Sequence, residues 1–241
     1  MRGGIRGLVG LVVLALAAGC ASPPAPDPDR AIVWGYVRLV PKKDLPGAGG
    51  GYGDRRLADV KRFDYSHPGH AVVFTSAAST TPAPAAAPPI AIVEERGRLR
   101  LEPAVASLSR SQGLSVRNRT DAVRIVSAPD VGWLQRIDPG ASARLDPPRT
   151  GELTLHLLGG AEGAIPPTAR VWIASGAVAD VDPAGRYVLE GLGPGEVELR
   201  AWHPRLPPTR AVALDLERGD VRRVDLEIGV DVSELGEGGA R

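Results

Sequence analysis

The chain has 241 residues, 43% of them hydrophobic, and carries 29 Lys and Arg against 28 Asp and Glu. This length is enough for one or two domains with a real core, and the near-neutral balance without long basic runs argues against a nucleic-acid partner. A single cysteine excludes a disulfide within the chain, while 30 glycines and 23 prolines fit a turn-rich β protein.

Residues 1–19 have the features of a targeting segment. Two arginines precede an apolar run at residues 8–18, which is too short to span a membrane comfortably. The run ends in LAAGC, and this motif at Cys20 resembles the lipobox of bacterial lipoproteins. The resemblance implies that residues 1–19 are removed and that Cys20 becomes a lipid-modified N-terminus, which anchors the protein in a membrane. The alternative is an ordinary cleaved signal peptide in which Cys20 plays no part.

The next residues, ASPPAPDPDR, predict a Pro-rich tether over residues 20–30 that holds the body off the membrane. No Asp stands next to Cys20, so we expect sorting to the outer rather than the inner membrane, with the body facing the periplasm. Loss of residues 1–19 removes two arginines and no acid, which changes the formal charge from +1 to −1.

Residues 31–40 (AIVWGYVRLV) and 71–75 (AVVFT) are the first two predicted strands. The glycine-rich stretch at 47–53 does not fit the phosphate-binding pattern G-x-G-x-x-G, because Tyr52 stands at the last position, and it is interpreted as a loop. Residues 76–89 (SAASTTPAPAAAPP) predict a Pro/Ala-rich loop or linker. The local pattern leaves open how residues 31–75 pair.

Strand patterns resume after residue 90, with 101–105 (LEPAV), 113–120 (GLSVRNRT) and 123–127 (VRIVS) in close succession. This order resembles the first half of a cupredoxin-like domain. The resemblance implies a Greek-key sandwich and places a ligand histidine at about Arg124. The returning strand, 151–158 (GELTLHLL), carries Cys, His and Met in copper-binding relatives, and here it contains only His156 of these.

A type 1 copper site can be tested from the sequence inventory, since it needs a thiolate and two imidazoles, usually with a weak axial Met. The one cysteine is Cys20, which the lipobox commits to the lipid, and the one methionine is Met1, which is lost with the signal. The sequence therefore excludes a type 1 copper centre.

Residues 168–230 read as a second, smaller β-sandwich. Charged and apolar residues alternate at 196–201, and alternation returns at 211–216 and 224–230, with a hairpin turn predicted at 218–220 between the last two. A tight turn is predicted at 182–185 (DPAG). The stretch resembles the carboxypeptidase regulatory-like (transthyretin-like) β-sandwich, whose hairpin signature is filled by Asp182, Gly185, Tyr187, Leu189, Leu192, Pro194 and Gly195.

The fold class expected is therefore all-β: a degenerate cupredoxin-like Greek-key sandwich followed by a small transthyretin-like sandwich. The order of lipobox and two sandwiches resembles methylamine-utilisation-type periplasmic proteins. The expected parts are a lipoprotein signal peptide at 1–19, a lipid-anchored tether at 20–30, the cupredoxin-like sandwich at 31–160 with its loop at 76–89, the carboxypeptidase regulatory-like sandwich at 166–231, and a polar tail at 232–241.

Two histidines lie in one polar loop, HPGH, with an aspartate nearby. A Pro-Gly turn can bring His67 and His70 together, and Asp64 would then be a third ligand for copper or zinc. The alternative is that these side chains are solvated surface residues. His156 is expected on the polar face of its strand, and His203 is expected to bond backbone groups at a strand end.

No pattern of catalytic residues is evident, so an enzyme is not expected. Asp180 and Asp182 are two apart with Pro183 after them, which is a turn rather than an acid/base pair, and no G-x-S-x-G elbow is present. The expected function is a non-catalytic, membrane-anchored periplasmic lipoprotein that serves as a binding or assembly module for another envelope protein. The alternative function is a metal-handling or redox accessory protein that uses His67 and His70.

Overall fold

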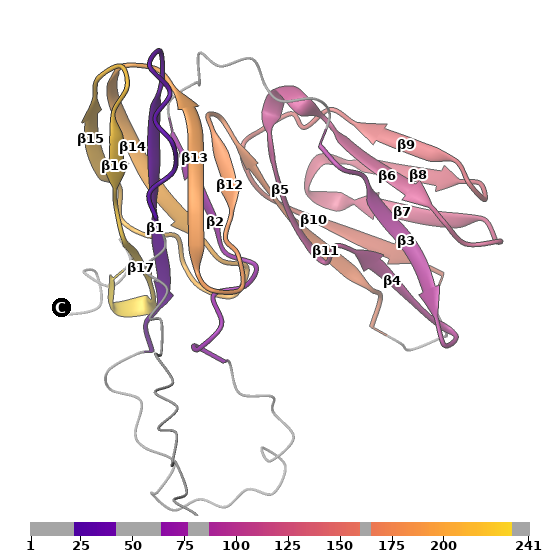
Figure 1. The fold of residues 1–241 in the computed structure, drawn as a ribbon. Helices are drawn as coiled ribbons and strands as arrows, with labels where there is room; N and C mark the ends of the chain where they lie inside the picture. Colours follow the sequence, from indigo (N-terminus) through magenta and orange to yellow (C-terminus); the bar gives the residue numbers. More distant parts are fainter. Residues whose placement is uncertain (1–21, 42–63, 77–86, 160–164, 233–241) are drawn as a thin grey trace, which may run out of the picture.

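The computed structural model describes residues 22–41, 64–76, 87–159 and 165–232. Within these residues the chain forms β-strands, labelled β1 to β17, and three-residue 3-10 helices at Arg110–Gln112, Pro129–Val131 and Val230–Val232. The strands form two β-sandwiches that lie next to each other (Figure 1). The all-β prediction is confirmed at this level. None of the helices in the described ranges has the length and apolar character to span a bilayer.

The first sandwich packs two sheets, with strand orders β5-β11-β10-β7-β8 and β4-β3-β6-β9. Neighbouring strands such as β3 and β4, or β7 and β8, form antiparallel hairpins. Two pairs of strands that are more distant in the sequence, β3 with β6 and β5 with β11, are parallel. Its strands are β3 (Ile90–Glu95), β4 (Arg98–Glu102), β5 (Val105–Ser109), β6 (Leu114–Asn118), β7 (Arg124–Ala128), β8 (Trp133–Ile137), β9 (Ser142–Leu145), β10 (Gly151–Leu158) and β11 (Thr168–Ala174).

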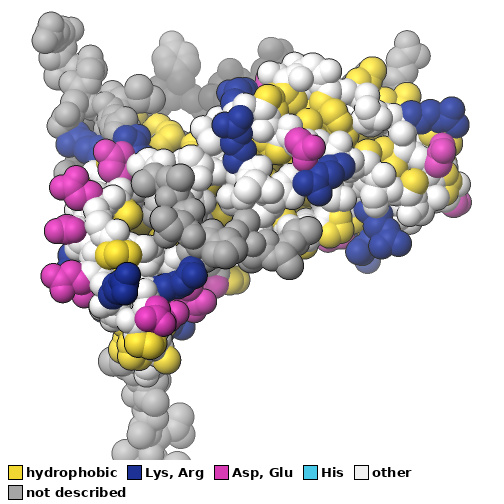
Figure 2. Space-filling model, turned by 90° about the horizontal axis from the view of Figure 1, so that it is seen from above, with side chains coloured by type: hydrophobic (Ala, Val, Ile, Leu, Met, Phe, Trp, Pro, Cys, Tyr) yellow, Lys and Arg dark blue, Asp and Glu magenta, His cyan; other side chains and the backbone are white. Residues whose placement is uncertain are grey.

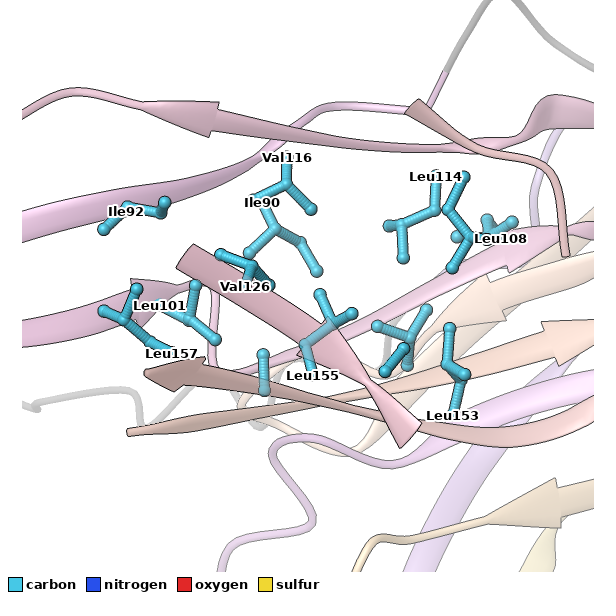
Figure 3. Packing of buried hydrophobic residues seen from close by; sticks show 14 of the residues in the cluster. Ile90, Ile92, Leu101, Leu108, Leu114, Val116, Val126, Leu153, Leu155 and Leu157 are labelled. Atoms are coloured by element: carbon cyan, nitrogen blue, oxygen red, sulfur yellow. The ribbon is translucent and has the colours of Figure 1, made fainter. Parts of the chain in front are cut away.

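Alternate residues of these strands fill the space between the two sheets. Leu153, Leu155 and Leu157 of β10 are at most 1% exposed, and they face Leu114 and Val116 of β6 across the core (Figure 3). The period of two in the sequence produces this packing because successive side chains of a strand point to opposite faces. Aliphatic side chains make up this core, as the scarcity of aromatic residues predicts.

The second sandwich also packs two sheets. One has the order β13-β1-β16 with β17 also pairing with β1, and the other has the order β12-β2-β14-β15. Its strands are β1 (Ala31–Leu39), β2 (Val72–Thr75), β12 (Val178–Asp180), β13 (Arg186–Leu192), β14 (Gly195–Trp202), β15 (Val212–Leu216), β16 (Val221–Arg223) and β17 (Leu226–Ile228).

Strand β1 is the centre of its sheet and is fitted closely to the chain beside it. It pairs antiparallel with β13 and parallel with β16 and then β17. The step between β16 and β17 brings the Val224 carbonyl over Gly35, where a Cβ would lie 1.9 Å from the oxygen. The same carbonyl accepts a hydrogen bond of 2.6 Å from the buried Tyr187 hydroxyl. Only glycine fits at position 35.

The pairing of residues 31–75, which the sequence left open, is with the second sandwich. β1 pairs with β13, and β2 pairs with β12 and β14. Conversely, β11, inside the expected range 166–231, pairs with β10 and β5 of the first sandwich. Its alternate residues Ala169, Val171 and Ile173 are buried in that core, so burial of this apolar face fixes the place of β11.

Two turns show where local prediction succeeded and where it did not. The turn at 182–185 is confirmed: Gly185 N–H donates to the Asp182 carbonyl at 2.9 Å, and Asp182 Oδ1 accepts from the Ala184 and Arg186 amides. The prediction of a hairpin at residues 218–220 is wrong. β15 pairs with β14 and β16 pairs with β1, so these residues cross from one sheet to the other.

The two sandwiches are joined by an aromatic cluster. The rings of Phe74 and Trp172 have centroids 4.7 Å apart, and Trp172 and Trp202 stack at 5.1 Å. Ser107 Oγ of β5 donates to Asp180 Oδ1 of β12 at 2.6 Å. The link from β11 in the first sandwich to β12 in the second is short, residues 175–177. This short link and the buried aromatic contacts hold the two sandwiches together.

Candidate functional site

The loop predicted to bind a metal begins with a pair of residues that do meet. Asp64 Oδ2 lies 3.0 Å from His67 Nδ1, and Asp64 Oδ1 accepts hydrogen bonds from the Ser66 amide at 2.9 Å and the Ser66 hydroxyl at 2.6 Å. The hydrogen bonds from Ser66 are the main reason that the pKa of the Asp64 carboxyl is lowered. Both side chains are largely exposed, 63% for Asp64 and 72% for His67, so the contact lies at the surface and is open to solvent.

His70 does not complete this pair. Its backbone has a φ of +75°, in the left-handed region, and its charge acts on the buried His203. In residues 64–76 and the other described ranges, no three side chains from His, Cys, Asp and Glu come close enough to hold a metal ion. The structure therefore brings together two of the three predicted ligands.

His203 is buried at the strand end where β14 stops. Its Nδ1 accepts a hydrogen bond of 3.2 Å from the Arg205 amide, as expected of a residue that bonds backbone groups. Burial is the main cause that lowers the pKa of His203 to about 4, and the nearby charge of His70 adds to the effect. At neutral pH His203 is an uncharged residue that fixes the turn after β14.

At the position where the cupredoxin resemblance places a ligand histidine, the chain has an ion pair. Arg124 Nη2 donates to Glu94 Oε2 at 2.9 Å, and Arg124 Nε donates to the Thr120 hydroxyl at 3.0 Å. Thr120 in turn donates to the buried Asn118 side chain, whose amide nitrogen is also bonded. A guanidinium group and its partners therefore occupy the place that the resemblance gives to a metal ligand.

His156, the other residue compared with copper ligands, faces the opposite side of the sheet from Arg124. It is half-buried between the core residues Leu155 and Leu157 and pairs with Ser127, which points outward from β7. Arg124 shares the inward side of β7 with the buried Val126. The two side chains cannot converge on one ion.

Cys20 lies outside the described residues, but the chain from Ser22 onward is seen. Residues 22–30, here called the N-terminal strap, fold back along β1. At one end Asp27 forms a β-bridge with Arg30, and at the other Arg186 Nη2 donates to the Ser22 carbonyl at 3.2 Å. The described part of the predicted tether is therefore laid on the second sandwich.

The strap lies at a face of β1 that holds a buried aromatic residue. Ile32 and Trp34 alternate with the core residues Val33 and Val37 and so point out of the sandwich, yet they are only 4% and 7% exposed. The guanidinium groups of Arg186 and Arg223 lie over the Trp34 ring, at 5.9 and 5.4 Å from its centroid.

The outer face of the five-stranded sheet carries exposed apolar side chains. Ile125 of β7 and Leu158 of β10 are paired residues, 42% and 38% exposed, and Leu134 of β8 lies diagonally across from Ile125 with 60% exposure. These three residues are called the apolar strip. Aliphatic side chains gathered on a water-facing sheet are typical of surfaces that bind a partner.

Two shallow hollows open on the second sandwich. One, of about 500 Å³, is lined by Glu196, Glu198 and Asp215, and the other, of about 330 Å³, has Arg30 and Arg218 at its rim. Figure 2 shows acidic side chains gathered at the end of the molecule that the second sandwich forms. In the first hollow the Ser76 hydroxyl donates to Glu198 Oε2 at 3.1 Å.

Sequence reasoning missed the apolar strip and the strap contacts. The strip lies in runs such as VRIVS and HLL, where apolar residues occur on both faces of the strand. The sequence therefore does not indicate which face is buried. The strap has a proline-rich sequence that is equally suited to a free spacer. No family model matches the chain, and no curated protein matches it.

Proposed function

We propose that this chain is a lipid-anchored, non-catalytic binding or assembly module of the bacterial cell envelope. Cys20 carries the lipid, the outer membrane is the favoured location, and the body faces the periplasm. The lipobox sequence supports the anchor, and the joined sandwiches support a rigid scaffold rather than two independent domains. In this proposal the first sandwich is a cupredoxin-like Greek key without a type 1 copper site, and the second is carboxypeptidase regulatory-like.

The observation that carries the binding role is the apolar strip. Leu134 exposes 60% of its surface beside Ile125 and Leu158, on the β7 and β8 side of the sheet, whereas the second sandwich contacts the edge formed by β5 and β11. Burial of apolar surface releases about 25 cal/mol per Å², so such a strip contributes to binding when another protein covers it. The partner is another protein of the envelope.

Photo-crosslinking in living cells tests this role. A photoreactive amino acid replaces Leu134, and a matched variant carries it at Arg98, an exposed residue of β4 in the opposite sheet. We expect a crosslinked partner from position 134 and none from position 98. Equal crosslinking from both positions, or none from either, contradicts a partner surface on the strip.

The second candidate is a metal-handling or redox accessory protein. The contact between Asp64 and His67, at 3.0 Å, is the observation that favours it, since His70 follows three residues later in the same loop. Copper or zinc would need this loop to move His70 toward the pair. Calorimetric titration with Cu(II) and Zn(II) separates the two candidates.

A further inference from the structure

The N-terminal strap fixes how the anchored protein meets the membrane. It begins two residues after Cys20, so this inference rests on the proposed lipid anchor. Ser22 is held by Arg186, and the Asp27–Arg30 bridge closes the turn that leads into β1. This turn lies beside Gly219, where an added Cβ would be 3.7 Å from the Pro28 oxygen. The strap therefore lies along the body instead of extending away from it.

The direction of the strap follows from these contacts. Arg186, which holds Ser22, pairs with Tyr36 near the end of β1, whereas Asp27 lies beside Arg30 just before β1 begins. Five extended steps from Ser22 to Asp27 cover roughly 15 Å, and five strand steps along β1 cover about 16 Å. The strap therefore runs antiparallel to β1, with its lipid-proximal end at the C-terminal end of β1.

The chain between Ser22 and the lipid at Cys20 is short. Only Ala21 lies between Cys20 and Ser22, and a fully extended chain covers about 7 Å in the two steps from 20 to 22, against roughly 33 Å for a free ten-residue tether. We propose that the anchored protein rests with the C-terminal end of β1 against the lipid surface, and that the turn at 218–220 points away from it. The length of β1, nine residues or about 30 Å, separates the two ends.

The chemistry of this end suits a phospholipid headgroup layer. Tyr36, Arg38 and Arg186 lie on β1 and β13 there, and Val230 follows β17 with 39% of its surface exposed. Tyrosine and arginine are favoured at the membrane interface, and basic residues are attracted to an anionic lipid surface.

Labels at the two ends test the proposal. Cys20 is the only cysteine, and lipidation uses its sulfur, so an introduced cysteine gives the one free thiol. The full lipidated protein is made as Arg38→Cys and as Arg218→Cys, with Glu227→Cys as a second label beside Arg38. Each variant carries a fluorophore and is reconstituted in phosphatidylethanolamine/phosphatidylglycerol vesicles that contain a spin-labelled headgroup lipid as the quencher.

We expect the labels at positions 38 and 227 to lose most of their fluorescence, and the label at 218 to lose little. A matched variant with ten Gly/Ser residues inserted between Ala21 and Ser22 keeps the strap but lengthens the connection, and it should abolish the difference. Equal quenching of the three labels in the uninserted protein overturns the proposal, and so does a difference that survives the insertion. Flotation with the vesicles is measured first, because a protein that does not float overturns the anchor itself.

Discussion

Arg124 joins the two sheets of the first sandwich through Glu94, with Nη2 of the arginine 2.9 Å from Oε2 of the glutamate. Arg124 comes from β7 in one sheet and Glu94 from β3 in the other, and each lies on the same side of its strand as a buried core residue, Val126 in β7 and Ile92 in β3. The arginine side chain is only 15% exposed. The pair closes one end of the sandwich at the place where the resemblance would put a metal ligand.

A double-mutant cycle measures this pair. We expect Arg124→Ala and Glu94→Ala to be coupled by about 1 kcal/mol or more, because the arginine is shielded from water. The matched control is the neighbouring pair Arg100 and Glu95, whose side chains are 51% and 55% exposed. Its coupling should be a few tenths of a kcal/mol. Urea unfolding measures both couplings, and equal values would show that shielding of Arg124 has no effect.

Substitution of Gly35 tests the fit of β1 against the chain that links β16 and β17. A Cβ there would lie 1.9 Å from the Val224 oxygen, so Gly35→Ala should destabilise the fold by about 3 kcal/mol or prevent folding. Gly69→Ala is the control, since nothing lies within 4 Å of the added atom and its effect should stay within about 0.5 kcal/mol. Thermal melts compare them, and similar melting temperatures would contradict the packing described.

The stability of the protein should fall in acid because of His203. Its pKa is about 4 in the fold and 6.5 in the unfolded chain, so the unfolded state binds the proton first. The free energy of unfolding therefore decreases as the pH falls from 6.5 to 4, by about 3 kcal/mol at most. Melting temperatures of the wild type and His203→Gln, measured across this window, test the assignment. Identical pH profiles would rule out His203 as the cause.

Substitution of His70 provides a second test of the lowered pKa of His203. Its charge helps to lower the pKa of His203, so His70→Ala should raise the pKa of the buried imidazole. NMR titration of His203 in the two proteins measures the change. An unchanged or lower pKa in the variant would mean that the two side chains do not interact.

Substitutions of the two tryptophans in the aromatic cluster between the sandwiches should differ in their effect on stability. Trp172 Nε1 is buried without a hydrogen-bond partner among the described residues, so Trp172→Phe should cost less than about 1 kcal/mol. Trp202 is 2% exposed and stacks on it, and Trp202→Ala should cost about 3–5 kcal/mol. Calorimetry should also resolve two transitions in the second variant, as the sandwiches uncouple. One cooperative transition would show that other contacts join them.

Metal titration separates the two proposed functions. Asp64 and His67 form a surface pair that His70 does not join, so we expect no tight stoichiometric binding of Cu(II) or Zn(II) by calorimetry. The control is the double variant His67→Ala/His70→Ala. Tight binding by the wild type that this variant loses would favour the metal-handling function.

Much of the fold is predictable from local sequence. Alternation of apolar and polar residues predicts strands such as β10 and β14, and the DPAG turn is determined by the Asp182 side chain and the left-handed Gly185. Strand partners are not predictable in this way. β1 pairs with β13, about 150 residues away, and no local pattern contains that choice.

The site was less predictable than the fold for a related reason. The sequence indicates that His67 and His70 lie on one turn, but it does not predict the left-handed backbone of His70 or the influence of His70 on the buried His203. Proline makes residues 22–30 extended in either case, and only the contacts of Ser22 with Arg186 and of Pro28 with Gly219 show that they lie on the body.

The intact mass of the protein extracted from bacterial membranes tests the central claim most directly. We expect a chain that begins at Cys20 and carries a diacylglyceryl group, and we expect a Cys20→Ser variant to leave the membrane fraction. An unmodified chain with a free Cys20 thiol, or an N-terminus at another residue, recovered in the soluble periplasmic fraction, would contradict the lipid anchor and the membrane orientation derived from it.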